Sequence, residues 1–290
     1  MENLVFFYPQ GHEAHSSLGH PERPERITAL RQALQSAGWW DVYPRLDPLD
    51  LTEEFIAQIH SRLYLEHLQL ACRRAASLDA DTYTTPASWQ LALNAAGGAA
   101  ATALAVWQGA ARRSLALTRP PGHHATSQRG MGFCLLNNIA LAAHFLLTLS
   151  AEIAKTAKRL AIVDLDLHHG NGTQEIFWRR NDVFFISTHQ SPLYPGSGGL
   201  NEIGEGDGRG YTANVPLPPF TGDQGFGAVM ETFILPLLDR FAPQMILVSF
   251  GFDSHWRDPL GNLSLSAGKY GELIRRLVEW ADANCEGKIA

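Results

Sequence analysis

The chain has 290 residues, of which 45% are hydrophobic and 18% are charged, and its formal net charge is −6. This is enough apolar material for a large core, and α/β domains of this length often form one unit, so we expect a single domain. A mildly acidic chain without a basic run is a poor candidate for nucleic-acid binding, and we expect no direct contact with nucleic acid.

The three cysteines, Cys72, Cys134 and Cys285, are widely spaced. They exclude a disulfide framework and do not indicate a cysteine-based zinc cluster. The N-terminal segment lacks the basic region of a signal peptide, and the longest apolar stretch, residues 139–149, is about half of the roughly 20 residues that a membrane span needs. We therefore expect a cytoplasmic protein that does not bind a membrane.

Along the chain, the hydrophobic pattern predicts strands that alternate with helices. Strands are predicted over residues 4–8, 115–118, 160–163, 183–187 and 245–250. Helices are predicted over residues 27–34, 89–111, 138–149, 175–178 and 273–281, with one more that begins near Thr52. Residues 191–223 are rich in glycine and proline and predict a long ordered loop, and residues 288–290 resemble the start of another strand. Continuous apolar strands between helices indicate a parallel sheet that is covered on both faces.

Four of the predicted strands end in polar segments that contain His, Asp or Ser. These segments read RPPGHH, DLDLHHGNG, STHQ and GFDSH. In open α/β sheets the ligand crevice lies outside the carboxyl ends of the strands. We therefore expect the four segments to converge at one edge of the sheet.

Asp164, Asp166 and His168 alternate at the end of an apolar strand, and this spacing places them on one side of an extended backbone. Carboxylate and imidazole ligands suit zinc, and a catalytic zinc keeps about three protein ligands and an open position. Asp253, at the end of another strand, would complete the set with Asp166 and His168 and leave Asp164 to orient a neighbour. The same ligands accept other divalent metals. The alternative, that these acids only cap loops and helix starts, is less favoured for the combined pattern than for a lone Asp.

His123 and His124 follow a Pro-Pro-Gly sequence whose prolines stiffen the backbone. Adjacent imidazoles on a fixed loop suit a shared acid–base task, in which one orients or polarises while the other moves the proton. Asp164 and Asn171 are candidate acceptors that would set their tautomers. A buried structural role is the usual interpretation of a single histidine and is less suitable for two in succession. Structural roles are expected for the neighbouring histidines His169, His189 and His255.

Six segments of the chain resemble, in family order, the histone deacetylase family of the arginase–deacetylase superfamily, closest to its class II-like bacterial amidohydrolases. These segments are GHPERPERI, RPPGHHATSQRGMGFCLLNN, VDLDLHHGNGTQEIF, STHQSPLYPGSG, NEIGEGDGRGYTANVPLP and GFDSHWRDPLG. The resemblance covers nearly the whole chain. It implies a histone deacetylase-like catalytic domain over residues 1–290, of the α/β class, with a central parallel sheet of about eight strands flanked by helices.

The resemblance also implies roles for the residues that the spacing singles out. It makes His124 the main general base and acid and His123 its electrostatic partner. Asp164 would pair with His123, and Asn171 stands where some family members have aspartate. The zinc ligands that it implies are the three that the spacing indicates.

Two further sets of residues are implied only by the resemblance. Phe133 and Tyr194, together with Gly132, match the walls of a tunnel for acyl-lysine, although ordinary core packing is an alternative for both aromatic side chains. Asp81 lies near the rim aspartate that grips the substrate backbone. A structural potassium ion would be bound by the backbone carbonyl groups of Asp164, Asp166, His168 and Thr188 and by the hydroxyl group of Ser187.

The resemblance ends at the C-terminus. Family members follow the terminal strand, which begins here with KIA, with a glycine-rich turn that carries a tyrosine or histidine. That side chain donates a hydrogen bond to the developing oxyanion. The chain stops at Ala290, before the turn, so we expect the last strand to be cut short and a C-terminal segment to be missing. Loss of one such donor costs about 10²–10³ in rate.

Together these features predict a zinc-dependent deacetylase that cleaves acyl groups from acyl-lysine or from small acylated amines with metal-activated water. One alternative is an acetylpolyamine amidohydrolase. Another, if the C-terminal tyrosine is truly absent, is a non-catalytic module that binds acyl-lysine or polyamine. A ureohydrolase of the arginase type is disfavoured, because its two-manganese site uses more paired carboxylates than DLDLHHG and GFD provide.

Overall fold

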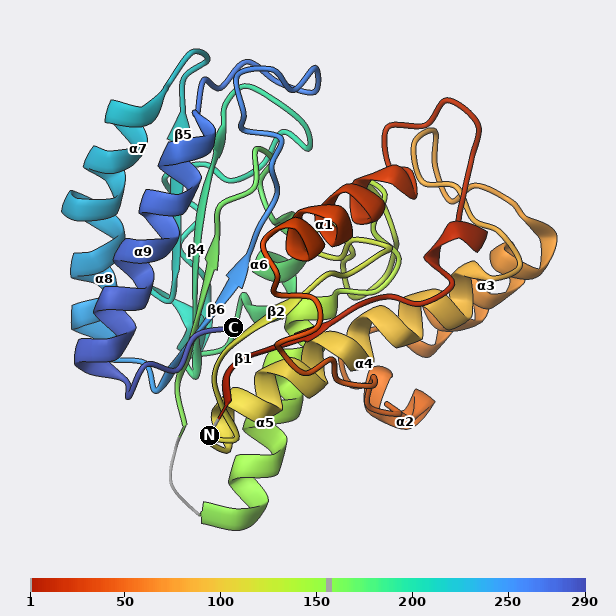
Figure 1. The fold of residues 1–290 in the computed structure, drawn as a ribbon, viewed down its shortest axis with the longest axis horizontal. Helices are drawn as coiled ribbons and strands as arrows, with labels where there is room; N and C mark the ends of the chain where they lie inside the picture. Colours follow the sequence, from red (N-terminus) through yellow and green to blue (C-terminus); the bar gives the residue numbers. More distant parts are fainter. Residues whose placement is uncertain (1, 155–157) are drawn as a thin grey trace. The chain divides into compact units, whose positions relative to one another are not determined.

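The structure is a computed structural model, and it describes residues 2–154 and 158–290. The chain divides into two compact units. Unit 1 comprises Met1–Leu146 together with Ala290, and unit 2 comprises Leu147–Ile289. Each unit has its own parallel strand pairing and its own helices (Figure 1). Within the described residues, no helix combines the length and apolar character that crossing a membrane requires.

Unit 1 contains two parallel strands, β1 (Glu2–Phe7) and β2 (Ala111–Ala116). Its helices are α1 (Glu25–Ser36), α2 (Glu53–Ile56), α3 (Arg62–Arg74) and α4 (Ser88–Trp107), preceded by a short 3-10 turn at His12–Ala14. The alanine-rich α4 packs closely on β1, as its small residues predict. A Cβ atom on Gly98 would lie 2.3 Å from the ring of Phe7. Glycine is therefore required at this helix–strand contact.

Unit 2 is built on a parallel sheet with the strand order β5-β4-β3-β6. The strands are β3 (Leu160–Asp164), β4 (Val183–Gln190), β5 (Thr212–Leu217) and β6 (Met245–Ser249). Every residue of β3 and β4 is buried, which explains why residues 160–163 and 183–186 are continuously apolar and do not alternate with polar residues. The crossover connections place β6 beside β3, although β4 and β5 come between them in the sequence.

Helices cover the sheet of unit 2. They are α6 (Asn171–Phe177), α7 (Asp223–Val229), α8 (Leu235–Phe241) and α9 (Ala267–Asn284), and α5 (Asn138–Ala154) contains the boundary between the units. A π-helical segment at Met230–Ile234 joins α7 to α8. Figure 1 shows α7, α8 and α9 side by side against the sheet. One face of α9 buries Tyr270, Leu273, Leu277 and Trp280 at helical spacing, and these side chains belong to the core of unit 2.

The α/β class and the parallel strands are confirmed, but the expected number of strands is not. The described residues form six named strands and not about eight. Residues 288–290 do behave as the start of a further strand, because Ile289 forms an isolated parallel bridge with Ile246. The predicted long loop over residues 191–223 is partly wrong, since it contains β5.

Candidate functional site

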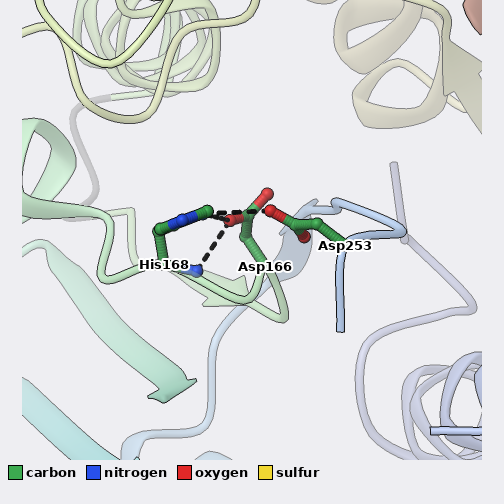
Figure 2. Close-up of side chains that lie close together, drawn as sticks. All are labelled: Asp166, His168 and Asp253. Carbon is green, nitrogen blue, oxygen red and sulfur yellow. Dashed lines mark hydrogen bonds and ion pairs between the residues drawn. The ribbon is translucent and has the colours of Figure 1, made fainter. Parts of the chain in front are cut away.

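Asp166, His168 and Asp253 direct three potential ligand atoms toward one point (Figure 2). One ligand atom from each residue lies within 4.8 Å of the others. Nδ1 of His168 is 3.0 Å from Oδ2 of Asp253 and 3.3 Å from Oδ1 of Asp166. The structure therefore brings together the three residues that the sequence predicts as metal ligands, although 85 residues separate His168 from Asp253.

The parallel pairing of β3 with β6 explains this convergence. Asp164, the last residue of β3, is the register partner of Ser249, the last residue of β6. Both connections therefore leave the sheet at the same edge. Gly251 makes room for the carboxylates, because a Cβ atom there would lie 1.9 Å from Oδ2 of Asp166 and 2.6 Å from Oδ1 of Asp253. Any larger residue at this position would displace the acidic side chains.

The prediction that Asp164, Asp166 and His168 alternate along an extended strand is only partly right. The strand β3 ends at Asp164, and the other two residues lie in the bend that follows. Carboxylate groups shape this bend by accepting hydrogen bonds from its backbone. Oδ1 of Asp164 accepts from the N–H of Asp166 at 3.2 Å, and Oδ1 of Asp166 accepts from the N–H of His168 at 2.8 Å. Oδ1 of Asp253 accepts from the N–H of Leu167 at 3.1 Å, which ties the two segments together.

The charges of this group fit a divalent cation. Burial alone would lower the pKa of His168, but hydrogen bonds and charges from Asp166 and Asp253 outweigh it and raise that pKa to about 10. Burial and the charge of Asp166 raise the pKa of Asp253. Two carboxylates and an imidazole this close therefore retain protons unless a cation replaces them. Together with the nitrogen and oxygen donor set, this makes the group a candidate metal site.

The histidine pair lies in unit 1 and is buried, with 9% of His123 and 3% of His124 exposed. Their ring centroids are 3.9 Å apart, and the ring planes are inclined by 42°. Gly122 allows the preceding turn to pack tightly, because a Cβ atom there would lie 2.6 Å from the backbone nitrogen of Asn138. The backbone N–H of His124 donates to Sγ of Cys134 at 3.4 Å. The sequence-predicted pair is thus fixed as two adjacent, enclosed imidazoles.

The residues assigned to the tunnel and rim in unit 1 lie close to one another. Gly132 and Phe133 have positive φ angles of 55° and 70°. This conformation is uncommon for a phenylalanine, and the N–H of Phe133 is held by a hydrogen bond to Oγ1 of Thr82 at 3.1 Å. The ring of His20 contacts Phe133 edge-on at 4.9 Å, and Nε2 of His20 is 3.1 Å from the carbonyl oxygen of Asp81.

In unit 2, the ring of Tyr194 lies beside the candidate metal site. Its centroid is 6.1 Å from that of His168, the planes are inclined by 77°, and 42% of the residue is exposed. Asn171 is the first residue of α6, is half-buried, and donates its backbone N–H to the carbonyl oxygen of His169 at 2.8 Å. Because its ring lies beside His168, Tyr194 is close enough to contact a small molecule that binds at the candidate metal site.

The residues assigned to a potassium ion lie where β3 and β4 pair. Ser187 is the register partner of Asp164, and both are fully buried. Oγ1 of Thr188 donates to the carbonyl oxygen of Asp164 at 3.4 Å. Nδ1 of His189 is 3.0 Å from Oγ of Ser187, while its Nε2 is 3.0 Å from the carbonyl oxygen of Gly198. Burial lowers the pKa of His189 to about 4, so its ring is neutral and carries one proton.

No sequence pattern singles out a second hydrogen-bond network, which is centred on the buried Gln174 and Asn214 and the half-buried Glu202. Nδ2 of Asn214 donates to Oε1 of Gln174 at 2.7 Å, and Nε2 of Gln174 donates to Oε2 of Glu202 at 2.6 Å. His169 joins this network through Gln174, and its Nδ1 lies 2.8 Å from Oγ of Ser197, while its structural role stays a prediction. Gln174, Glu202 and Asn214 all lie within segments that resemble the histone deacetylase family. This resemblance is the one sequence feature that could have indicated them.

Comparison with known proteins identifies the family. The model of the histone deacetylase domain matches residues 20–290. A protein of Archaeoglobus fulgidus named "Probable deacetylase" is 40% identical over 287 residues, which cover 98% of this chain and 78% of that protein. The "Histone deacetylase-like amidohydrolase" of Pseudomonas aeruginosa is 36% identical over 276 residues, which cover 94% of this chain and 71% of that protein.

A solved structure shows the same fold. The crystal structure of the HDA15 HD domain superposes with a TM-score of 0.89 at 32% sequence identity. The match covers 99% of this chain and 81% of that chain. Because sequence and fold agree over almost the whole length, the likeness reflects common descent and not a shared architecture alone. The chain therefore belongs to the histone deacetylase family, whose members among its relatives carry the names of deacetylases and amidohydrolases.

Proposed function

We propose that this protein is a zinc-dependent deacetylase that hydrolyses the amide bond of acyl-lysine or of a small acylated amine. The observation that carries the proposal is the convergence of Asp166, His168 and Asp253 on one point in a chain of the histone deacetylase family. Three ligands of this kind leave a coordination position open for substrate or water, as catalytic zinc sites do. The names of the relatives support hydrolysis of an amide bond.

Asp166, His168 and Asp253 would hold the ion, with His168 binding as a neutral imidazole. A zinc ion supplies Lewis acidity, which polarises a substrate carbonyl group and makes water a better nucleophile at neutral pH. Asp164 contributes by holding the bend that carries two of the ligands, through its hydrogen bond from the N–H of Asp166. The protein thus fixes the ligands before the ion binds.

The proton transfers are proposed for the histidine pair. His124 accepts a proton from the attacking water and later donates it to the leaving amine, so that one imidazole serves both halves of the reaction. His123, with its ring centroid 3.9 Å away, would orient and polarise this partner. Asp164 and Asn171 are the proposed acceptors that set the two tautomers. Phe133, Gly132 and Tyr194 would line the acyl group, and Asp81 would hold the substrate backbone at the rim.

We also propose a structural potassium ion at the residues where β3 and β4 pair. The hydrogen bonds of His189 support this. Because its Nε2 faces the Gly198 carbonyl, it carries the proton there, and Nδ1 accepts from the hydroxyl group of Ser187. The lone pairs of Ser187 Oγ are then available to a cation, which the backbone carbonyl groups of Asp164, Asp166, His168 and Thr188 would also bind.

The test replaces one metal ligand and compares it with an acidic neighbour. Asp253→Ala is expected to lose bound zinc and to lose deacetylation, because two ligands hold the ion too weakly. The matched control is Asp258→Ala in the same loop, whose carboxylate accepts a hydrogen bond from the backbone of Leu260. That variant should keep its zinc. Zinc content and acetate release at the wild-type level in Asp253→Ala would refute the proposal.

The substrate class is tested in the same assay. An acetyl-lysine peptide and acetylspermidine are offered together, and the ratio of their turnover gives the preference. Tight binding of the peptide without acetate release from the zinc-loaded protein would instead indicate a binding module.

A further inference from the structure

Glu202 gathers three N–H donors on its carboxylate. Oε1 accepts from the backbone N–H groups of Gly198 at 2.9 Å and Gly199 at 2.8 Å, and Oε2 accepts from Nε2 of Gln174 at 2.6 Å. Within the described parts of the chain, no lysine or arginine pairs with it. Burial alone would raise the pKa of Glu202, but these donors lower it, so the group is a carboxylate at neutral pH.

The segment that Glu202 holds, residues 194–199, is also fixed by two histidine rings. Gly198 has a φ angle of 88°, and a Cβ atom there would lie 2.4 Å from Nε2 of His189 and 2.7 Å from Cγ of His169. Its carbonyl group is 3.0 Å from that His189 nitrogen. Oγ of Ser197 is 2.8 Å from Nδ1 of His169. Residues 197–199 are therefore held by the two histidine rings and by the carboxylate of Glu202.

The residues that Glu202 contacts are connected on two sides to residues of the candidate metal site. Gln174, which donates to Glu202, has its Oε1 3.1 Å from Nε2 of His169, and His169 is the chain neighbour of His168. At the other end of the segment, the ring of Tyr194 lies 6.1 Å from the ring of His168. The hydrogen bonds of Glu202 thus connect the backbone that carries Tyr194 to the backbone that carries a proposed zinc ligand.

We propose that Glu202 is a positioning residue that fixes residues 194–199 and so holds the ring of Tyr194 beside His168 as a wall for the acyl group. This inference rests on the proposed function. It predicts that Glu202 governs affinity for the acyl chain and selectivity for its length, while metal binding and the chemical step depend on other residues. A glutamine cannot replace it, because one of its two terminal atoms is a donor and would face either the glycine N–H groups or Gln174.

The experiment compares Glu202→Gln with Glu205→Gln. Glu205 lies in the same loop, so its replacement by glutamine is the same chemical change. Its side chain is exposed, and its carboxylate pairs with Arg179 at 2.9 Å. Steady-state kinetics are measured with acetyl-lysine and butyryl-lysine peptides, and zinc content is determined on the same samples. For Glu202→Gln we expect KM for the acetyl peptide to rise about 5–10-fold, with kcat and zinc content within about two-fold of wild type. The ratio of kcat/KM between the two peptides should move toward one.

A second measurement does not depend on turnover. Hydrogen–deuterium exchange of the peptide that contains residues 191–202 reports on the N–H groups of Gly198 and Gly199. Glu202→Gln should speed their exchange about ten-fold, and Glu205→Gln should leave it unchanged. Glu202→Asp, which keeps the charge but has a shorter reach, should give intermediate exchange and an intermediate KM. This variant serves if Glu202→Gln does not fold.

Equal exchange in the two glutamine variants would overturn the role of Glu202 in holding the segment. Faster exchange with unchanged KM and unchanged acyl selectivity would overturn its role in positioning Tyr194. A joint loss of zinc and kcat would also overturn the inference, because Glu202 would then support the metal loop. A wild-type protein that turns over neither peptide contradicts the proposed function, whereas the exchange data still decide whether Glu202 holds the segment.

Discussion

Arg119 donates to both carboxylate oxygens of Glu22, at 2.8 and 3.0 Å, across 97 residues of sequence. Neither side chain has more than 1% of its surface exposed. Nη2 also donates to the hydroxyl group of Tyr83, and Nη1 donates to the carbonyl group of His12. Arg119 stands four residues before His123 in the sequence. The buried ion pair therefore anchors the segment that presents the histidine pair.

Breaking this pair should destabilise the protein strongly. Glu22→Gln leaves the guanidinium group of Arg119 buried without its counter-charge, and we expect a loss of about 3–5 kcal/mol in the free energy of unfolding. Urea denaturation measures this loss. Glu25→Gln is the control, because Glu25 lies in an exposed pair with Arg23 at 4.0 Å, and less than about 1 kcal/mol should be lost. Equal losses of unfolding free energy in Glu22→Gln and Glu25→Gln would contradict the stabilising role of the buried pair.

Acid should destabilise the protein through His60. Nδ1 of this buried ring lies 2.8 Å from the carbonyl oxygen of Thr126, and Nε2 accepts from the N–H of Asn137 at 3.0 Å. Burial lowers the pKa of His60 to about 4, below the value of about 6.5 in the unfolded chain. Because the folded pKa is the lower one, the stabilisation is complete above about pH 6.5 and is lost as the pH falls toward 4. The stabilisation that is lost amounts to about 3 kcal/mol.

The variant His60→Gln removes this titration. Its unfolding free energy should therefore change less between pH 7 and about pH 4.5 than that of the wild type. His67→Gln, at an exposed position of α3, should keep the wild-type dependence. An identical pH dependence of His60→Gln and wild type would show that His60 does not titrate in this range.

Zinc binding should release a proton. In the metal-free protein the hydrogen bonds that His168 donates to the carboxylates of Asp166 and Asp253 overcome burial and raise the pKa of His168 to about 10, so the imidazole is protonated at neutral pH. The ion must displace this proton, and zinc affinity should rise about ten-fold per pH unit for each proton released. Calorimetry in buffers of different ionisation enthalpy measures the number of protons. Zinc affinity that does not change between pH 6.5 and 8.5 would contradict this.

Removal of zinc should also lower the melting temperature. A ligand present at about 100 times its dissociation constant stabilises the folded state by about 2.7 kcal/mol. Differential scanning fluorimetry with and without a chelator should show this difference in the wild type. It should be absent in Asp253→Ala, because that variant has lost a ligand.

The two histidines of the pair should contribute unequally to turnover. His124→Gln removes the proposed general base and acid, and we expect kcat to fall by about 10²–10⁴ with zinc content unchanged. His123→Gln should cost less, because it removes only the orienting partner. Steady-state kinetics together with metal analysis separate these effects from a loss of zinc. A larger effect at His123 would reverse the two proposed roles.

The sequence predicts that Asp166, His168 and Asp253 come together, because parallel strands end at a common edge. Asp166, His168 and Asp253 could be grouped from spacing and from strand ends alone. The sequence could not predict that β6 pairs directly with β3, since this neighbourhood comes from the crossover connections. Nor did it predict β5, which is an edge strand that contains Pro216. Proline is tolerated at a sheet edge, where its missing N–H costs no ladder hydrogen bond, and its presence made the segment resemble a loop.

The Glu202 hydrogen bonds were missed for a different reason. Each of these hydrogen bonds links one carboxylate oxygen of Glu202 to one N–H group of Gly198, Gly199 or Gln174. Such contacts produce no periodic pattern in the sequence. The same holds for the Arg119–Glu22 pair, since no local rule relates residues 97 positions apart. Periodicity reports burial and strand direction, whereas individual polar contacts over long separations appear only once the backbone is placed.

Because β3 is aligned with β6, binding of the proposed zinc ion would depend on correct pairing of these two strands. A slip of one residue between the strands would move Asp253 by about 3.3 Å along the sheet. Zinc–oxygen bonds are only about 2.0–2.2 Å long, so a slipped chain would lose its third ligand. A refolding molecule that captures the proposed zinc ion would therefore already have aligned these two strands, and the bound ion would stabilise that alignment.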